Sequence, residues 1–300
     1  MTLILGLLTD QYVTLVSDRR VTWMSPTGRI TKQEDTDTKT FVICGHFLMG
    51  FTGYARFQDL PMEKWLSQVL KDVEPDPDAI SNRTFDAIRD AATTEFGRLP
   101  YDARQEHHTF VVVGYANDAD SGGGLVPTRL LISNSLNEQN QLVSRATGST
   151  FRIAQEWLRN RRHLLTRVGY PPPAGAMHQA DTALRRVVNE LPDDPLPAVD
   201  ILVGCLRAGA ESSNGTVGKN GMFATLPRRV VPASSFVVPL GGGLLTVDSK
   251  SEMLAGYIRS EAKTAKEAAV YAPAIFCPRM NLGTAEMDPE RLPPRQQNGQ

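Results

Sequence analysis

The chain has 300 residues, of which 41% are hydrophobic, and its 32 Lys and Arg residues nearly balance 33 Asp and Glu residues. The resulting net charge of -1 gives no field that would gather a polyanion, so nucleic acid and anionic membranes are disfavoured as partners. The three cysteines are far apart in apolar segments, which indicates buried, reduced thiols. We expect one large domain over residues 1–286, followed by a tail over 287–300 that is too polar to fold.

The apolar opening segment, MTLILGLLTDQYVTLV, has no basic start and is interrupted at Thr9-Asp10-Gln11. It is therefore not expected to be a signal peptide. No stretch approaches the roughly 20 apolar residues that a membrane-spanning helix needs. The sequence predicts a soluble, cytoplasmic protein.

Two β-hairpins are predicted near the start of the chain. The first joins apolar runs over 2–8 and 12–17, and the second joins runs over 39–43 and 47–53. Both are apolar enough to lie in a sheet that is covered on its two faces. The first strand would then hold the chain terminus in the core, whereas the first residues of most domains are loose.

The remaining elements follow from changes in apolar periodicity. Helices are predicted over about 57–70, 83–96, 149–162, 177–191 and 198–209. Strands are predicted over 108–116, 128–134 and 141–148, with further strand-like runs between 221 and 248. The order of strands, helices, strands and helices indicates an α+β protein.

Thr2 is a candidate nucleophile. Initiator Met is commonly removed before a small residue, and removal of Met1 would leave Thr2 with both a hydroxyl and a free α-amine. An α-amine with a pKa of about 7.7–8.0 can act as a base at neutral pH, which an ordinary Lys at about 10.4 cannot. A Met-Thr start alone carries little weight, because many chains begin this way.

The residues that follow strengthen this candidate. The first hairpin closes on Asp18-Arg19-Arg20-Val21-Thr22, Lys39 opens the next strand, and Gly53 closes the hairpin after it. Over about the first sixty residues, this arrangement resembles the proteasome β subunits and the bacterial HslV peptidase, which are N-terminal-nucleophile hydrolases. The resemblance implies a four-layer α-β-β-α sandwich with two mainly antiparallel sheets between helix layers. It also implies a peptide or protein substrate, a ring-like homo-oligomer and no cofactor, and it leaves an unfoldase partner open.

The resemblance also implies roles for individual residues. Thr2 would be the nucleophile, Lys39 the ammonium that lowers the pKa of the Thr2 groups, and Asp18 the carboxylate that holds Lys39. The backbone N–H of Gly53 would stabilise the oxyanion. Substrate-binding positions would be Arg20, Val21, Thr22, Phe51 and Ala55, with Phe51 as the floor of a shallow side-chain pocket that favours small residues.

Four further positions carry the resemblance into the later chain. Thr147 matches a hydroxyl in the turn before a helix, where Ser149 is the alternative match or an N-cap. Glu211 and Asn214 match the family's later Asp and Ser. The sequence departs from the family in about five extra residues between Asp18 and Lys39, in Tyr54 after Gly53, and in the segment 163–235, which has no clear counterpart.

These departures leave three functions open. The chain is a threonine peptidase, a non-catalytic proteasome-like scaffold subunit, or an amidase for a small non-peptide amide. A metal site at His107-His108 is not predicted, because neighbouring strand residues point to opposite faces and no ligand follows at a useful spacing. Residues 215–219 lack the spacing of a phosphate-binding loop.

Overall fold

The computed structural model describes most of the chain. The described residues are 2–24, 30–35, 37–43, 46–57, 60–71, 73, 82–117, 125–143, 146, 148–228, 254–270, 275–277 and 280–282. The predicted tail over 287–300 and the strand-like runs predicted between 229 and 248 lie outside them.

One sheet has six strands in the order β12-β1-β2-β13-β14-β15, and all its neighbours are antiparallel. Its strands are β1 (Leu3–Thr9), β2 (Tyr12–Asp18), β12 (His163–Gly169), β13 (Gly221–Pro227), β14 (Leu254–Ile258) and β15 (Ala269–Val270). Leu3 lies opposite Gly169 on β12, and Ile4 lies opposite Ser17 on β2. The first strand of the chain is therefore an interior strand of this sheet.

The other large sheet has seven strands in the order β11-β10-β9-β6-β5-β16-β17. Its strands are β5 (Thr40–Ile43), β6 (Phe47–Thr52), β9 (Thr109–Asn117), β10 (Leu125–Ser133), β11 (Arg152–Trp157), β16 (Ile275–Cys277) and β17 (Met280–Leu282). Only β5 and β16 pair in parallel. Two short ribbons complete the described strands: β3 (Val21–Met24) with β4 (Ile30–Glu34), and β7 (Arg56–Phe57) with β8 (Leu60–Pro61).

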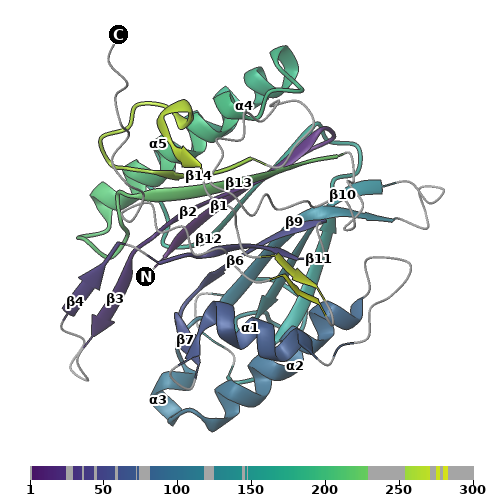
Figure 1. Cartoon of the computed structure of the whole chain (residues 1–300), viewed down its shortest axis with the longest axis vertical. Coiled ribbons are helices and arrows are strands. Elements are labelled where there is room, and N and C mark those ends of the chain that lie inside the picture. Colours follow the sequence, from purple (N-terminus) through teal and green to yellow (C-terminus); the bar gives the residue numbers. More distant parts are fainter. Residues whose placement is uncertain are drawn as a thin grey trace.

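The helices lie on the outer faces of these sheets (Figure 1). They are α1 (Met62–Lys71), α2 (Asn82–Arg98), α3 (Tyr101–Arg104), α4 (Ala174–Glu190) and α5 (Leu196–Ser212), with a 3-10 turn over Ala265–Glu267. Helices α4 and α5 pack on the six-stranded sheet, whereas α1 and α2 pack on the seven-stranded sheet. None of the helices in the described residues is both long and apolar enough to cross a membrane.

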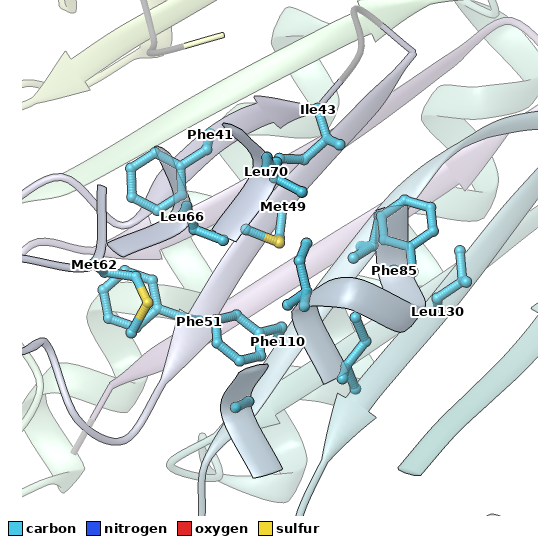
Figure 2. Close-up of a cluster of buried hydrophobic side chains, with 14 of the residues drawn as sticks. Phe41, Ile43, Met49, Phe51, Met62, Leu66, Leu70, Phe85, Phe110 and Leu130 are labelled. Carbon is cyan, nitrogen blue, oxygen red and sulfur yellow. The ribbon is translucent and has the colours of Figure 1, made fainter. Parts of the chain in front are cut away.

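Successive side chains of β1 point to opposite faces of its sheet, and its apolar run is buried on both faces. Ile4 and Leu8 join the core between the two sheets, and Leu3, Leu5 and Leu7 join the core under α4 and α5. A third core lies between the seven-stranded sheet and helices α1 and α2, where Figure 2 shows the aromatic and aliphatic side chains that fill it. Both predicted hairpins are confirmed, and the chain is an α+β protein built on antiparallel sheets.

The prediction of a helix over 149–162 is wrong. Residues Arg152–Trp157 form the edge strand β11, in which Ile153 lies opposite Ile132 of β10. The mixed apolar and polar pattern of this segment fits a half-exposed edge strand as well as an amphipathic helix, and pairing with β10 decides between them. Ser149 is therefore not a helix N-cap.

Three other elements differ from the prediction. The first helix begins at Met62, because Phe57 and Leu60 belong to the ribbon β7–β8. Strand β12, which pairs along the whole length of β1, was not predicted. Of the strand predicted over 141–148, the described residues show only an isolated bridge between Leu136 and Leu142.

Candidate active site

Thr2 is fixed by backbone contacts on both sides of its carbonyl. The Thr2 carbonyl accepts a hydrogen bond from the Tyr170 N–H at 2.9 Å, and the following N–H, that of Leu3, donates to Asp18 Oδ1 at 3.0 Å. Tyr170 directly follows β12, and Asp18 ends β2, so both neighbouring strands hold the start of β1. The position of the Thr2 side chain is therefore set by the sheet.

Lys39 reaches this threonine from the start of β5, and its side chain is 1% exposed. Its Nζ donates to Thr2 Oγ1 at 2.8 Å, to Asp18 Oδ2 at 3.4 Å, and to the Arg20 carbonyl in a short hydrogen bond. An ammonium group has three N–H donors and no acceptor. All three donors of Lys39 thus have a partner, and one of these partners is the proposed nucleophile.

Asp18 is fully buried and is held by three backbone N–H groups in addition to Lys39. Leu3 donates to Oδ1, while Arg20 and Gly218 donate to Oδ2 at 3.0 and 3.2 Å. A buried carboxylate is costly unless it is paired and hydrogen-bonded, and this one has both kinds of partner. The structure therefore brings Thr2, Asp18 and Lys39 into one buried hydrogen-bonded cluster.

Residues of the segment between Asp18 and Lys39 contact the loop after α5. Arg20 makes a bidentate ion pair with Asp35 through two contacts of 2.6 Å, and its Nη1 donates to the Gly215 carbonyl at 2.8 Å. Gln33 on β4 donates to the same carbonyl at 2.6 Å. The ribbon β3–β4 is thus tied to the loop after α5, and Figure 1 shows it close to the marked N-terminus.

Gly53 lies in the turn that follows β6, with a φ of 98°, and it is exposed. A Cβ placed on Gly169 would lie 1.9 Å from the Thr2 carbonyl oxygen and 3.1 Å from Thr52 Cγ2. The end of β6 therefore lies beside Thr2. Gly53 and Gly169, whose φ is 88°, both have a positive φ, which glycine adopts readily.

Three of the predicted substrate-binding positions lie on β3 and just after β6. Val21 and Thr22 lie on β3, opposite Glu34 and Gln33 of β4. Ala55 is half-buried, and its carbonyl accepts the Met62 N–H at 3.1 Å. Arg20 contributes its backbone to the cluster, while its guanidinium is engaged by Asp35.

Phe51 is buried in the core under α1 and α2, where its ring stacks on Phe41 at a centroid distance of 6.0 Å (Figure 2). Its predicted role as the floor of a side-chain pocket stays a prediction.

No described contact joins the later predicted positions to the cluster. Thr147 lies outside the described residues, and Ser149 is half-buried in the segment before β11. Glu211 is exposed near the end of α5, and Asn214 is exposed with a φ of 51°.

Ser213 and Gly218 were missed by the sequence analysis. Buried Ser213 donates to the Ala210 carbonyl at 2.9 Å and accepts the Val217 N–H at 3.0 Å, which shapes the loop that delivers the Gly218 N–H to Asp18. Their only sequence signal is the Ser-Asn-Gly turn after α5.

Two titratable groups near the cluster are shifted by burial. Burial raises the pKa of the Asp37 carboxyl, and the charge of Lys39 opposes the rise. Burial alone lowers the pKa of His108, which lies behind Gly53, to about 3. Within the described ranges, no three His, Cys, Asp or Glu side chains gather in a way that could hold a metal ion.

A cavity of about 430 Å³ lies elsewhere, and its lining contains none of the cluster residues. It is lined by Phe85, Asp86, Arg89, Leu130, Phe151, Arg152, Ile153 and Gln155.

No protein-family description and no curated protein matches the sequence. Among solved structures, the chain is similar to Anbu from Hyphomicrobium sp. strain MC1, as a Gly-1 mutant with 14% identity and a TM-score of 0.43 over 76% of this chain and 82% of that one. A second structure of Anbu from that organism has 12% identity and a TM-score of 0.40 over 76% and 83%. Anbu (ancestral beta-subunit) from Yersinia bercovieri has 12% identity and a TM-score of 0.39 over 75% and 81%. At these values the likeness says nothing of activity.

We expect Asp18→Asn to destabilise the fold more than Lys39→Met. The amide would turn an NH₂ group toward a backbone N–H and leave the buried ammonium without a counter-charge, whereas Lys39→Met leaves the carboxylate with three N–H donors. Loss of one partner of a buried pair costs about 3–5 kcal/mol, to be measured by urea unfolding at pH 7. Asp37→Asn is the control and should be neutral or stabilising, because burial disfavours its charge. Equal losses for Asp18→Asn and Lys39→Met would contradict this account of the carboxylate.

The low pKa of His108 predicts a loss of stability in acid. The folded pKa of about 3 lies below the ordinary value of 6.5, so the fold favours the neutral imidazole. This stability is complete above pH 6.5 and is lost as the pH falls from 6.5 toward 3, with a slope that approaches about 1.4 kcal/mol per pH unit. Unfolding free energies of His108→Leu should lack this part of the slope, whereas a variant of the exposed His178, His178→Gln, should keep it. The same slope in His108→Leu and the wild type would refute the assignment.

Proposed function

We propose that the chain is a threonine-type N-terminal-nucleophile amidohydrolase that cleaves peptide bonds, with the proteasome-like four-layer α-β-β-α arrangement. The observation that carries the proposal is the contact of 2.8 Å between Lys39 Nζ and Thr2 Oγ1, inside a cluster completed by Asp18. Replacing a buried ion pair with apolar residues is often neutral or stabilising, so stability alone does not explain why this pair lies against a hydroxyl.

The proposed reaction begins once Met1 has been removed. The α-amine of Thr2 takes the hydroxyl proton as Oγ attacks the substrate carbonyl, and the Gly53 N–H donates to the oxygen that becomes negative. The amine then gives its proton to the leaving nitrogen, the C–N bond breaks, and an ester joins the acyl group to Thr2. Water attacks this ester with the α-amine again as base, which releases the acid and restores the hydroxyl.

Lys39 has a supporting part in this scheme, which its hydrogen bonds support. Its three N–H donors point to Thr2 Oγ1, Asp18 and the Arg20 carbonyl, so Lys39 acts as a donor to the nucleophile oxygen rather than as its base. A cation at this distance stabilises the negative charge that develops on Oγ. Asp18, held by three N–H groups, keeps the ammonium in place.

An extended peptide is the substrate that suits the unpaired edge of β3 among the described strands. Among the described strands, β3 pairs only with β4, which leaves its second edge free, and the turn at Gly53 lies at the end of β6 near Thr2. A peptide added as a strand between Val21–Thr22 and Gly53–Ala55 would bring its carbonyl to Thr2. Preference for small residues at the cleavage site, a ring-like homo-oligomer, an unfoldase partner and a cytoplasmic location stay predictions.

The second candidate is the non-catalytic scaffold. Thr2 is only 6% exposed in the chain that carries Met1. A scaffold would keep Met1 and this burial, whereas the proposed enzyme requires that Met1 be removed. For the third candidate, an amidase of small non-peptide amides, the described cavity gives no support, because none of its lining residues belongs to the cluster.

Thr2→Val and Thr2→Ser form a matched pair that tests the proposal. Valine keeps the shape of threonine without the hydroxyl, and serine keeps the hydroxyl; both are small enough for Met1 to be removed. With a fluorogenic peptide amide, kcat/KM should fall at least about 10³-fold in Thr2→Val and stay within about tenfold in Thr2→Ser. Mass spectrometry on each variant serves as the control that Met1 has been removed. Equal hydrolysis by wild type and Thr2→Val would show that another residue is the nucleophile.

A further inference from the structure

We propose that His108 is a positioning residue, whose Nδ1 holds the Gly53–Tyr54 turn in the orientation that presents the Gly53 N–H to the substrate oxygen. The inference rests on the proposed function, because it concerns the oxyanion donor of that reaction. His108 directly precedes β9, and its contact with the turn joins residues 54 positions apart in the chain.

The turn at Gly53 needs an external restraint. Glycine is the residue with the greatest conformational freedom, so its own backbone preference does not fix the direction of its N–H. The next amide, Tyr54 N–H, donates to His108 Nδ1 at 3.1 Å. A Cβ placed on Gly53 would lie 2.6 Å from both His108 Nδ1 and the His107 carbonyl oxygen. The turn therefore rests directly on the imidazole ring.

The imidazole is itself held on every side. Five phenyl rings have centroids between 4.7 and 6.3 Å from its own: those of Phe51, Phe57, Phe96, Phe110 and Phe151. The His108 backbone is fixed as well, since its N–H donates to Asn134 Oδ1 at 2.9 Å and its carbonyl accepts from Ser133 Oγ at 3.0 Å. Figure 2 shows Phe51 and Phe110 within the same core. The ring is thus a rigid support with Nδ1 directed at the turn.

Packing alone does not explain why a histidine lies among these phenyl rings. Nδ1 accepts a hydrogen bond and so carries no proton, which places the ring proton of the neutral imidazole on Nε2. Burial lowers the pKa of His108 to about 3, so the ring stays neutral at physiological pH. Buried Nε2 has no hydrogen-bond partner in the described residues. An unpaired N–H among phenyl rings is destabilising, whereas an aliphatic side chain would not be. The acceptor at Nδ1 is what distinguishes histidine from such a side chain here.

His108→Asn and His108→Leu separate the acceptor from the packing. Asn and Leu have nearly the same shape, and Asn Oδ1 can occupy the place of Nδ1, whereas Leu has no acceptor. Of these two variants, the one with the higher unfolding midpoint should therefore have the lower kcat. His108→Leu should keep or raise the unfolding midpoint and lower kcat about 10- to 100-fold with little change in KM, because a misplaced donor weakens transition-state binding. His108→Asn should be less stable and recover most of kcat.

A second measurement is independent of activity. Hydrogen exchange of the Tyr54 amide should be slow in the wild type and in His108→Asn, and faster in His108→Leu. If the wild-type protein catalyses no acyl transfer, both the proposed function and the inference that rests on it are overturned. Active wild type, with His108→Leu retaining both its kcat and the protection of the Tyr54 amide, would overturn the positioning role alone.

Discussion

The buried ion pair between Asp18 and Lys39 is the interaction on which the site depends. Two charges removed from water need a full set of partners, and the chain supplies them from segments far apart in sequence. The start of β1 gives the Leu3 N–H and the Thr2 hydroxyl, the end of β2 gives both backbone groups of Arg20, and the loop after α5 gives the Gly218 N–H. The pair therefore fixes where these segments meet, and Thr2 lies at that point.

The ribbon β3–β4, which follows Asp18, is joined to the ion pair through Arg20. A two-stranded ribbon alone is marginally stable in water, and β3–β4 is anchored at its base by Arg20, which joins Asp35 to the Gly215 carbonyl. The same arginine presents its backbone N–H to Asp18 and its carbonyl to Lys39. Through this residue the ribbon, the loop after α5 and the ion pair form one connected structure.

Much of the fold around the site was predictable because its signals are local. The apolar runs of the first two hairpins and the order Thr2, Asp18, Lys39, Gly53 are visible in the sequence, and pairing of β1 with β2 brings Asp18 to the start of the chain. Gly218 and Ser213 were not predictable, since Gly218 acts through a backbone N–H about 200 residues from Asp18 and leaves no side-chain pattern. The pattern of strand β11 fits a helix equally well, and only pairing with β10 decides between them. The contact of His108 with Tyr54 depends on tertiary structure, so no local pattern in the sequence predicts it.

The most direct test of the central claim is the intact mass of the purified protein before and after treatment with a peptide epoxyketone. This probe forms its two-point adduct only with a residue that has both a free α-amine and a neighbouring hydroxyl. The account predicts that Met1 is absent, that one adduct forms per chain at Thr2, and that Thr2→Ala forms none. Retention of Met1 with no adduct would contradict the N-terminal-nucleophile mechanism and leave the chain as a scaffold.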